Sequence, residues 1–273
     1  MRDAESASSL RMLFACGEQY RRRYVEGEKI PPGVAAHSGK GVHLSQAKNL
    51  QWRFDNKHGE ELPLDHCESI ARDETVAGIE SGTLWKAGED KASATADAVD
   101  SSVRLAGLIH KDLTPQINPA SREDIERAWR VEFDGFPFAL MGYFDVVEES
   151  TVRDLKTKRK SPSQGEADSS EQLTLYALAR KVEAGKIPEV ALDFAVDLKR
   201  GPKVVVQTST RTDAHLDVEL RRVEAAARLI ESATFVPAAS DSWLCDERWC
   251  GYASTCPYYL RSPNSYAVKG GAR

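Results

Sequence analysis

Short runs in the middle of the chain alternate apolar with polar residues, which is the pattern of half-buried β-strands. The pattern predicts three consecutive strands, at 124–134, 136–148 and 151–157. Two further apolar runs, VALDFAVDLK and KVVVQTST, flank Gly201–Pro202 and predict another strand pair. We therefore expect these five strands to form one mixed sheet.

Helical spacing of apolar residues marks the segments around these strands. The first helix is expected at 6–25, with Ser6 or Ser8 as its N-cap. Its apolar side is formed by Leu10, Leu13, Phe14 and Tyr20. Further helices are expected from about residue 41, at 168–185 and at 212–233, the last of them capped by Thr212 or Asp213.

Residues 59–110 are acidic and rich in alanine, and their weak helical periodicity predicts a helical insert. With the linker LTPQINPASRED that follows, this insert spans 59–120. The elements therefore run helix, helix, helical insert, three strands, helix, two strands and helix. This order predicts a single α/β (α+β) domain over 1–273, with a mixed central sheet flanked by helices.

Composition narrows the class of protein. The 273 residues are 41% apolar and 29% charged, as in an ordinary globular protein. The N-terminus, MRDAESASSLRMLF, lacks the apolar run of a secretory signal, and no stretch approaches 18 apolar residues. We therefore expect a cytoplasmic protein with no membrane partner. Neither GxGxxG nor a P-loop is present, which argues against the corresponding nucleotide-binding folds.

The net charge of −5 argues against a surface coated with positive charge for nucleic acid. It leaves room for a local basic groove, because short basic clusters occur at Arg21–Arg23, Lys156–Lys160 and Lys199–Arg200. Each cluster taken alone is more typical of solvated surface.

The segment GYFDVVEESTVRDLKTKRK, residues 142–160, places two aspartates across a predicted hairpin. If Val147 pairs with Val152, then Asp145 lies directly opposite Asp154 on the same face of the sheet. Like charges at that position destabilise a hairpin. A hard divalent cation between the two carboxylates would remove the repulsion. The segment therefore predicts a Mg²⁺ or Mn²⁺ site.

Lys156 follows Asp154 by two residues and shares its face of the strand. An amine there would position or deprotonate a water that attacks a phosphate, or stabilise charge on the phosphorus. The metal ion would lower the pKa of that water. The alternative is a surface hairpin with a solvated Asp–Lys cluster. The apolar residues that flank the aspartates favour strands near the core.

The motif GYFD followed by DLK resembles the active-site signature of the PD-(D/E)XK nuclease superfamily. More narrowly, the chain is similar to the RecB-type exonuclease branch, with its CRISPR-associated and phage members. That branch carries a histidine on an early helix, and GKGVH offers His43. It also carries a Q-x-x-x-Y motif, for which EQLTLY offers Gln172 and Tyr176 on one helix face. The similarity covers nearly the whole chain except the insert.

The resemblance implies a restriction-endonuclease-like fold and a role for each matching residue. The implied metal ligands are His43, Asp145, Asp154 and the backbone carbonyl of Leu155. Lys156 would be the catalytic lysine, and Gln172 and Tyr176 would orient it or contact DNA. Glu132 would be an outer-shell acid.

Four of the five cysteines follow a pattern of one early and three late residues, namely Cys16, Cys245, Cys250 and Cys256. This pattern resembles the iron–sulfur staple of RecB-like nucleases, and implies a [4Fe–4S] cluster that joins 237–260 to the first helix. The spacing C-x4-C-x5-C departs from the C-x2-C-x5-C of that family. A structural Zn²⁺ ion and reduced, buried thiols are the alternatives. We expect no ligand role for Cys67.

These expectations point to a metal-dependent DNA exonuclease that acts on ends or single strands. The alternative is a DNA-binding subunit with a secondary nuclease centre, which would serve a repair, recombination or CRISPR-adaptation complex. The expected partner is DNA, with further copies of the chain or a larger assembly as additional partners. A site-specific endonuclease ranks last, because no segment resembles a separate recognition domain.

Overall fold

A six-stranded mixed sheet forms the centre of the computed structural model, which describes residues 2–56, 59–86, 88–239 and 241–259. The strands are β1 (Ala4–Glu5), β2 (Ile125–Val131), β3 (Ala139–Val147), β4 (Thr151–Lys158), β5 (Glu189–Val196) and β6 (Lys203–Ser209). The order is β1-β3-β4-β5-β6, and β2 pairs with β3 as well. All five predicted strands are confirmed. Strand β1 was not predicted, because two residues are too few to show an alternating pattern.

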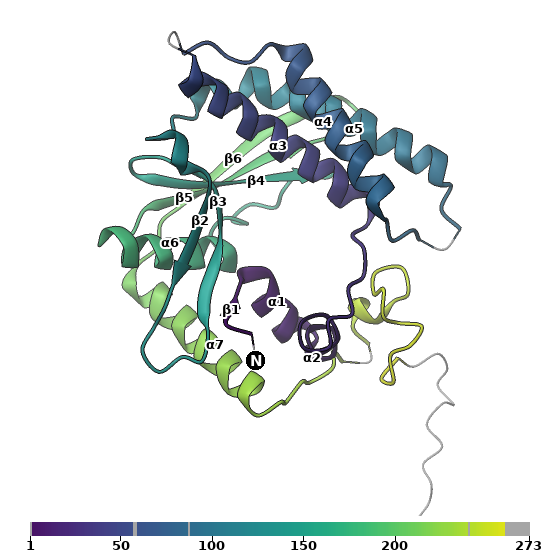
Figure 1. The fold of residues 1–273 in the computed structure, drawn as a ribbon, viewed down its shortest axis with the longest axis vertical. Coiled ribbons are helices and arrows are strands. Elements are labelled where there is room, and N and C mark those ends of the chain that lie inside the picture. The colour runs from purple at the N-terminus through teal and green to yellow at the C-terminus, as the bar shows by residue number, and fades with distance from the viewer. Residues whose placement is uncertain (1, 57–58, 87, 240, 260–273) are drawn as a thin grey trace, which may run out of the picture.

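Helices cover both faces of the sheet (Figure 1). The α-helices are α1 (Ala7–Ala15), α2 (Gly17–Tyr20), α3 (Val34–Asp55), α4 (Leu64–Ser81), α5 (Lys91–Asp112), α6 (Glu171–Ala184) and α7 (Asp213–Glu231). Short helical turns lie at Arg21–Val25, Thr114–Gln116, Arg122–Asp124 and Trp243–Cys245. No described helix combines the length and the apolar character that crossing a membrane requires.

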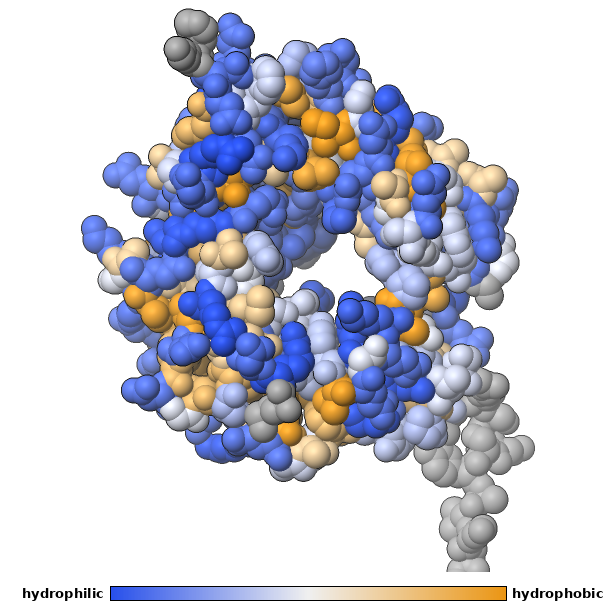
Figure 2. Space-filling view, viewed as in Figure 1, coloured by the Kyte–Doolittle hydropathy of each residue, from blue (hydrophilic) through white to orange (hydrophobic). Residues whose placement is uncertain are grey.

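Two apolar clusters hold these layers together. On one face, Leu50 of α3 and Ile109 of α5 pack with Leu155 of β4. On the other, α1, α6 and α7 pack on the sheet through residues such as Leu173 and Phe194. The helical character expected for 59–120 is confirmed by α4 and α5, which pack with α3 (Figure 1). In Figure 2 an opening passes through the molecule, in the region that Figure 1 places between α1 and α3.

The prediction of a single helix over 6–25 is wrong, because the helix is interrupted at Cys16. Ser6 caps α1 as expected, but Cys16 is extended. The N–H of Gly17 donates to the carbonyl of Val236 at 2.7 Å, and a Cβ on Gly17 would lie 2.6 Å from the Val236 nitrogen. The helix is therefore interrupted where the segment around Val236 crosses it. This contact joins residues that are more than 200 positions apart in the sequence.

Helix α3 begins at Val34, several residues before the predicted start. The sequence associates the glycines of this segment with a loop. In the structure they lie in α3, where they allow a neighbouring helix to approach closely. A Cβ on Gly41 would lie 2.4 Å from the carbonyl oxygen of Ala71 in α4. Glycine is thus required here by packing, which brings α4 against the helix that carries His43.

We expect Gly41→Ala to lower the free energy of unfolding by about 1–3 kcal/mol, because overpacking displaces α4. Gly107→Ala is the matched control. Its Cβ would lie 2.9 Å from the carboxylate end of the Glu68 side chain and 3.7 Å from Cδ1 of Leu64, which is an ordinary contact. That side chain can move, and alanine favours a helix by about 1 kcal/mol. Urea denaturation followed by circular dichroism compares the two variants, and equal stability of both would contradict the packing argument.

Candidate active site

Strands β3 and β4 separate next to the predicted catalytic residues. Their ladder pairs Val147 with Val152, as predicted, and Val146 with Arg153, where it ends. The next pair, predicted to be Asp145 with Asp154, is not part of the ladder. Instead, the backbone N–H of Leu155 donates to Oδ2 of Asp145 at 2.7 Å. The carboxylate therefore occupies the place of a main-chain partner and is fixed between the two strands.

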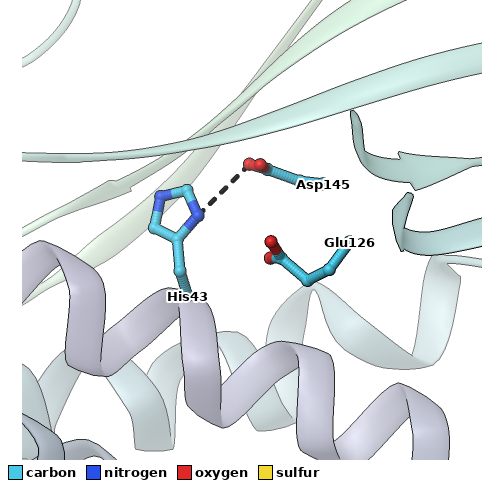
Figure 3. Close-up of side chains that lie close together, drawn as sticks. All are labelled: His43, Glu126 and Asp145. Atoms are coloured by element: carbon cyan, nitrogen blue, oxygen red, sulfur yellow. Dashed lines mark ion pairs between the residues drawn. The ribbon is translucent and has the colours of Figure 1, made fainter. Parts of the chain in front are cut away.

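A histidine and two carboxylates converge beside this separation (Figure 3). His43 projects from α3, and its Nδ1 lies 3.2 Å from Oδ2 of Asp145. Glu126, at the start of β2, points toward both. One ligand atom from each of the three residues lies within 4.8 Å of the others. An imidazole with two carboxylates is a suitable donor set for a divalent metal ion such as Mn²⁺.

Glu126 is the site residue that sequence reasoning missed. Its φ of 52° is left-handed, which is uncommon for a residue with a Cβ and costs about 1–3 kcal/mol. Nothing in the run IERAWRV signals this conformation, since a polar second position is ordinary for a strand. The outer-shell role expected for Glu132 is not matched by its position. Glu132 follows the far end of β2, where it is exposed and lies 3.4 Å from Arg130.

A second group of polar residues surrounds Asp154, which is 1% exposed. Lys156 Nζ lies 2.7 Å from Oδ2 of Asp154 and donates to Oε1 of Gln172 at 3.0 Å. Gln172 Nε2 donates to Oδ1 of Asp154 at 2.8 Å and to the Tyr176 hydroxyl at 2.7 Å. Tyr176 donates in turn to Oδ1 of Asp154 at 3.3 Å. Gln172 and Tyr176 thus share one face of α6, as expected, and hold the acid and the lysine in place.

Negative charge accumulates in the site. Burial raises the pKa of Asp154 to about 6, with a contribution from Asp145, although Lys156 opposes the shift. Burial and the charge of Asp145 raise the pKa of Glu126 to about 7. Burial opposes protonation of His43, but the contact with Asp145 outweighs it and raises the pKa of His43. A cation among these groups would relieve the repulsion, so the donor set fits a divalent metal ion.

Asp154 lies apart from the group around His43. Its Oδ2 is buried, and its polar contact is the ion pair with Lys156 at 2.7 Å. The structure places Asp154 outside the group of three that converges around His43. Its role as a metal ligand, like that of the Leu155 carbonyl, stays a prediction.

The four cysteines of the predicted staple line one small apolar cavity, namely Cys16, Cys245, Cys250 and Cys256. The N–H of Ala238 donates to Cys16 Sγ at 3.4 Å, and Gln19 donates to Cys250 Sγ at 3.3 Å. Burial raises the pKa of the Cys245 thiol, and the other three cysteines add to the shift. The structure thus brings the early and late cysteines together, whereas Cys67 lies buried in α4.

A family model described as the PD-(D/E)XK nuclease superfamily matches residues 4–257. The chain belongs to this superfamily. The mixed sheet with flanking helices is consistent with the restriction-endonuclease-like fold expected for a PD-(D/E)XK nuclease. The narrower RecB-type assignment stays a prediction. No curated protein matches the sequence.

Two solved structures illustrate the likeness. A protein from Eubacterium rectale, described as a candidate exonuclease, has a TM-score of 0.50 at 12% identity, with 89% of this chain and 86% of that chain covered. The protein SSO0001 has a TM-score of 0.44 at 11% identity, with 95% of this chain and 88% of that chain covered. At this level of identity the first likeness supports the fold alone.

We expect Glu126→Gln to weaken Mn²⁺ binding by about tenfold, because it removes one anionic donor from the group around His43. Glu132→Gln is the control, because Glu132 is an exposed acid directly after the other end of β2. This variant should bind Mn²⁺ as the wild type does. Isothermal titration calorimetry in the absence of nucleic acid measures both affinities. Unchanged binding by the Glu126 variant would show that this carboxylate is not a ligand.

Proposed function

We propose that the protein is a Mg²⁺- or Mn²⁺-dependent DNA exonuclease that hydrolyses phosphodiester bonds with a metal-activated water. The observation that supports this proposal most directly is the convergence of His43, Glu126 and Asp145 beside the Lys156 amine. In a chain of the PD-(D/E)XK superfamily, these are the groups that phosphodiester hydrolysis needs.

In this proposal His43, Glu126 and Asp145 hold the metal ion, with Asp154 and the Leu155 carbonyl as further ligands. When bound, the ion supplies a water of lowered pKa and neutralises charge on the phosphate. Burial raises the pKa of Asp154, and a bound cation would stabilise its charged form, which supports its assignment as a ligand.

Lys156 is the positively charged group that faces the substrate phosphate. Gln172 fixes its Nζ through Oε1, so that the amine is held near the centre rather than free to rotate. From this position it donates hydrogen bonds to the attacking water or to an oxygen on which charge develops. Tyr176 acts as a positioning residue, since it contacts Gln172 and Asp154 rather than the substrate.

We also propose that the four clustered cysteines bind a [4Fe–4S] cluster that links the two ends of the chain. Tetrahedral zinc with bonds of about 2.3 Å requires sulfur atoms about 3.8 Å apart. Among the described residues, three potential metal-ligand atoms lie within 4.8 Å of one another at His43, Glu126 and Asp145. No three of the cysteine sulfurs in the described part of the chain meet this criterion. A cavity lined by all four thiols supplies the four thiolates that the cluster requires.

We expect Lys156→Ala and Asp154→Asn each to lower the rate of DNA degradation by at least about 10³-fold. The first removes the positive charge beside the reacting phosphate, and the second removes an anionic ligand of the proposed metal ion. Lys160→Ala, an exposed lysine of the same segment, is the control and should keep full activity. The assay follows end-labelled DNA with Mg²⁺ or Mn²⁺, next to RNA of the same sequence. Circular dichroism checks the fold.

Full activity of both folded variants would refute the assignment of the site. Degradation of the RNA but not of the DNA would refute the proposed substrate.

We expect protein purified without oxygen to be brown, with broad visible absorption and about four irons per chain. Cys250→Ser should lose this colour and iron, because it removes one of four thiolate ligands. Cys67→Ser, which alters a buried cysteine outside the cluster, should keep both. Metal analysis that finds one zinc and no iron would overturn the iron–sulfur proposal.

A further inference from the structure

A cavity of about 1220 Å³ lies next to the catalytic centre, between α1 and the face of β3, β4 and β5. Asp145 and Lys156 form part of its wall. Five cationic and three acidic side chains line it, although the whole chain carries a net charge of −5. The wall is therefore positive where the protein as a whole is negative, which favours a polyanion as the occupant.

Two exposed aromatic side chains lie in this wall. Tyr143, on β3 two residues before Asp145, is 56% exposed, and Phe14, on α1, is 38% exposed. The adjacent residues in the chain, Phe144 and Leu13, point into the core and are buried. The rings of Tyr143 and Phe14 are not members of that core cluster. Two aromatic rings exposed in one cavity with charged walls are suited to stacking on planar groups of a ligand.

Arginines lie beside these rings. Arg11 and Phe14 are three residues apart on α1, so they lie on one side of the helix, and both are exposed. The Arg222 guanidinium lies 4.7 Å from the centre of the Phe14 ring. Arg11 is exposed and makes no ion pair with any residue that the structure describes. Its charge is available to a phosphate group.

We propose that this cavity binds a single strand of DNA and leads it to the catalytic centre. Phe14 and Tyr143 stack on bases, while Arg11 and Arg222 contact phosphates. The bases of a duplex are stacked on each other, so exposed aromatic rings find free base faces only on a single strand. The opening between α1 and α3 in Figure 2 is consistent with a path for one strand. The inference rests on the proposed nuclease function.

The test measures binding without cleavage. Fluorescence anisotropy of a labelled oligothymidylate is followed with the full-length protein in EDTA. Phe14→Ala and Tyr143→Ala should each raise the Kd by about 5- to 150-fold, the loss expected for one stacked base. Phe54→Ala, which removes a ring of similar exposure on α3 outside the cavity, should leave the Kd unchanged.

Salt dependence tests the phosphate contacts. Arg11→Gln should lower the slope of log K against log salt concentration by about 0.7, as for one contact to a single strand. Arg221→Gln, an exposed arginine next to Arg222 on α7, is the charge-matched control and should keep the wild-type slope. A blunt duplex of the same sequence should compete at least tenfold less well than the single strand.

Wild-type affinity in both aromatic variants, or equal competition by the duplex, would overturn the inference. Its failure is distinguishable from failure of the nuclease proposal. Cleavage that depends on Lys156, without binding that depends on Phe14 and Tyr143, leaves the nuclease and removes the single-strand site. The reverse result leaves the single-strand site and removes the nuclease.

Discussion

The candidate site depends on the hydrogen bond between the Leu155 N–H and the Asp145 carboxylate. A regular hairpin would place two carboxylates directly opposite each other and close the space between the strands. Here β3 and β4 separate after Val146 and Arg153, and the side chain of Asp145 takes the place of the missing main-chain partner. The separation satisfies a backbone donor and fixes Asp145 in the wall of the cavity, beside Lys156. Asp154 lies buried behind the lysine, with which it forms an ion pair.

The charged side chains of the site form two groups, one on each side of the Asp145 carboxylate. On the α3 side, His43 and Glu126 approach Asp145, and together they form a donor set that suits a metal ion. On the α6 side, Gln172 binds both Asp154 and Lys156, so that the amine offsets part of the negative charge. Burial of acids usually favours their neutral form, and a bound cation would favour their charged form. The arrangement is therefore one in which metal binding and the charge of the acids support each other.

Residues 236–256 meet α1, the helix that forms the other wall of the cavity. The C-terminal segment interrupts the first helix at Cys16 and brings the other three clustered cysteines to it. Helix α1 is thereby fixed in two ways: its own Leu10 and Leu13 are buried in the core, and the C-terminal segment crosses its end. A cluster or metal ion at the cysteines would stabilise the position of α1, and with it the exposed face that carries Arg11 and Phe14.

The sequence by itself determined the strands, the Val147–Val152 register of the hairpin and the shared helix face of Gln172 and Tyr176. Each of these follows from local periodicity, which a short segment encodes on its own. Only the tertiary structure decided the break at Cys16, the early start of α3 and the presence of Glu126 in the site. Those features arise from contacts between distant segments and from one left-handed backbone angle, neither of which leaves a periodic signal in the chain.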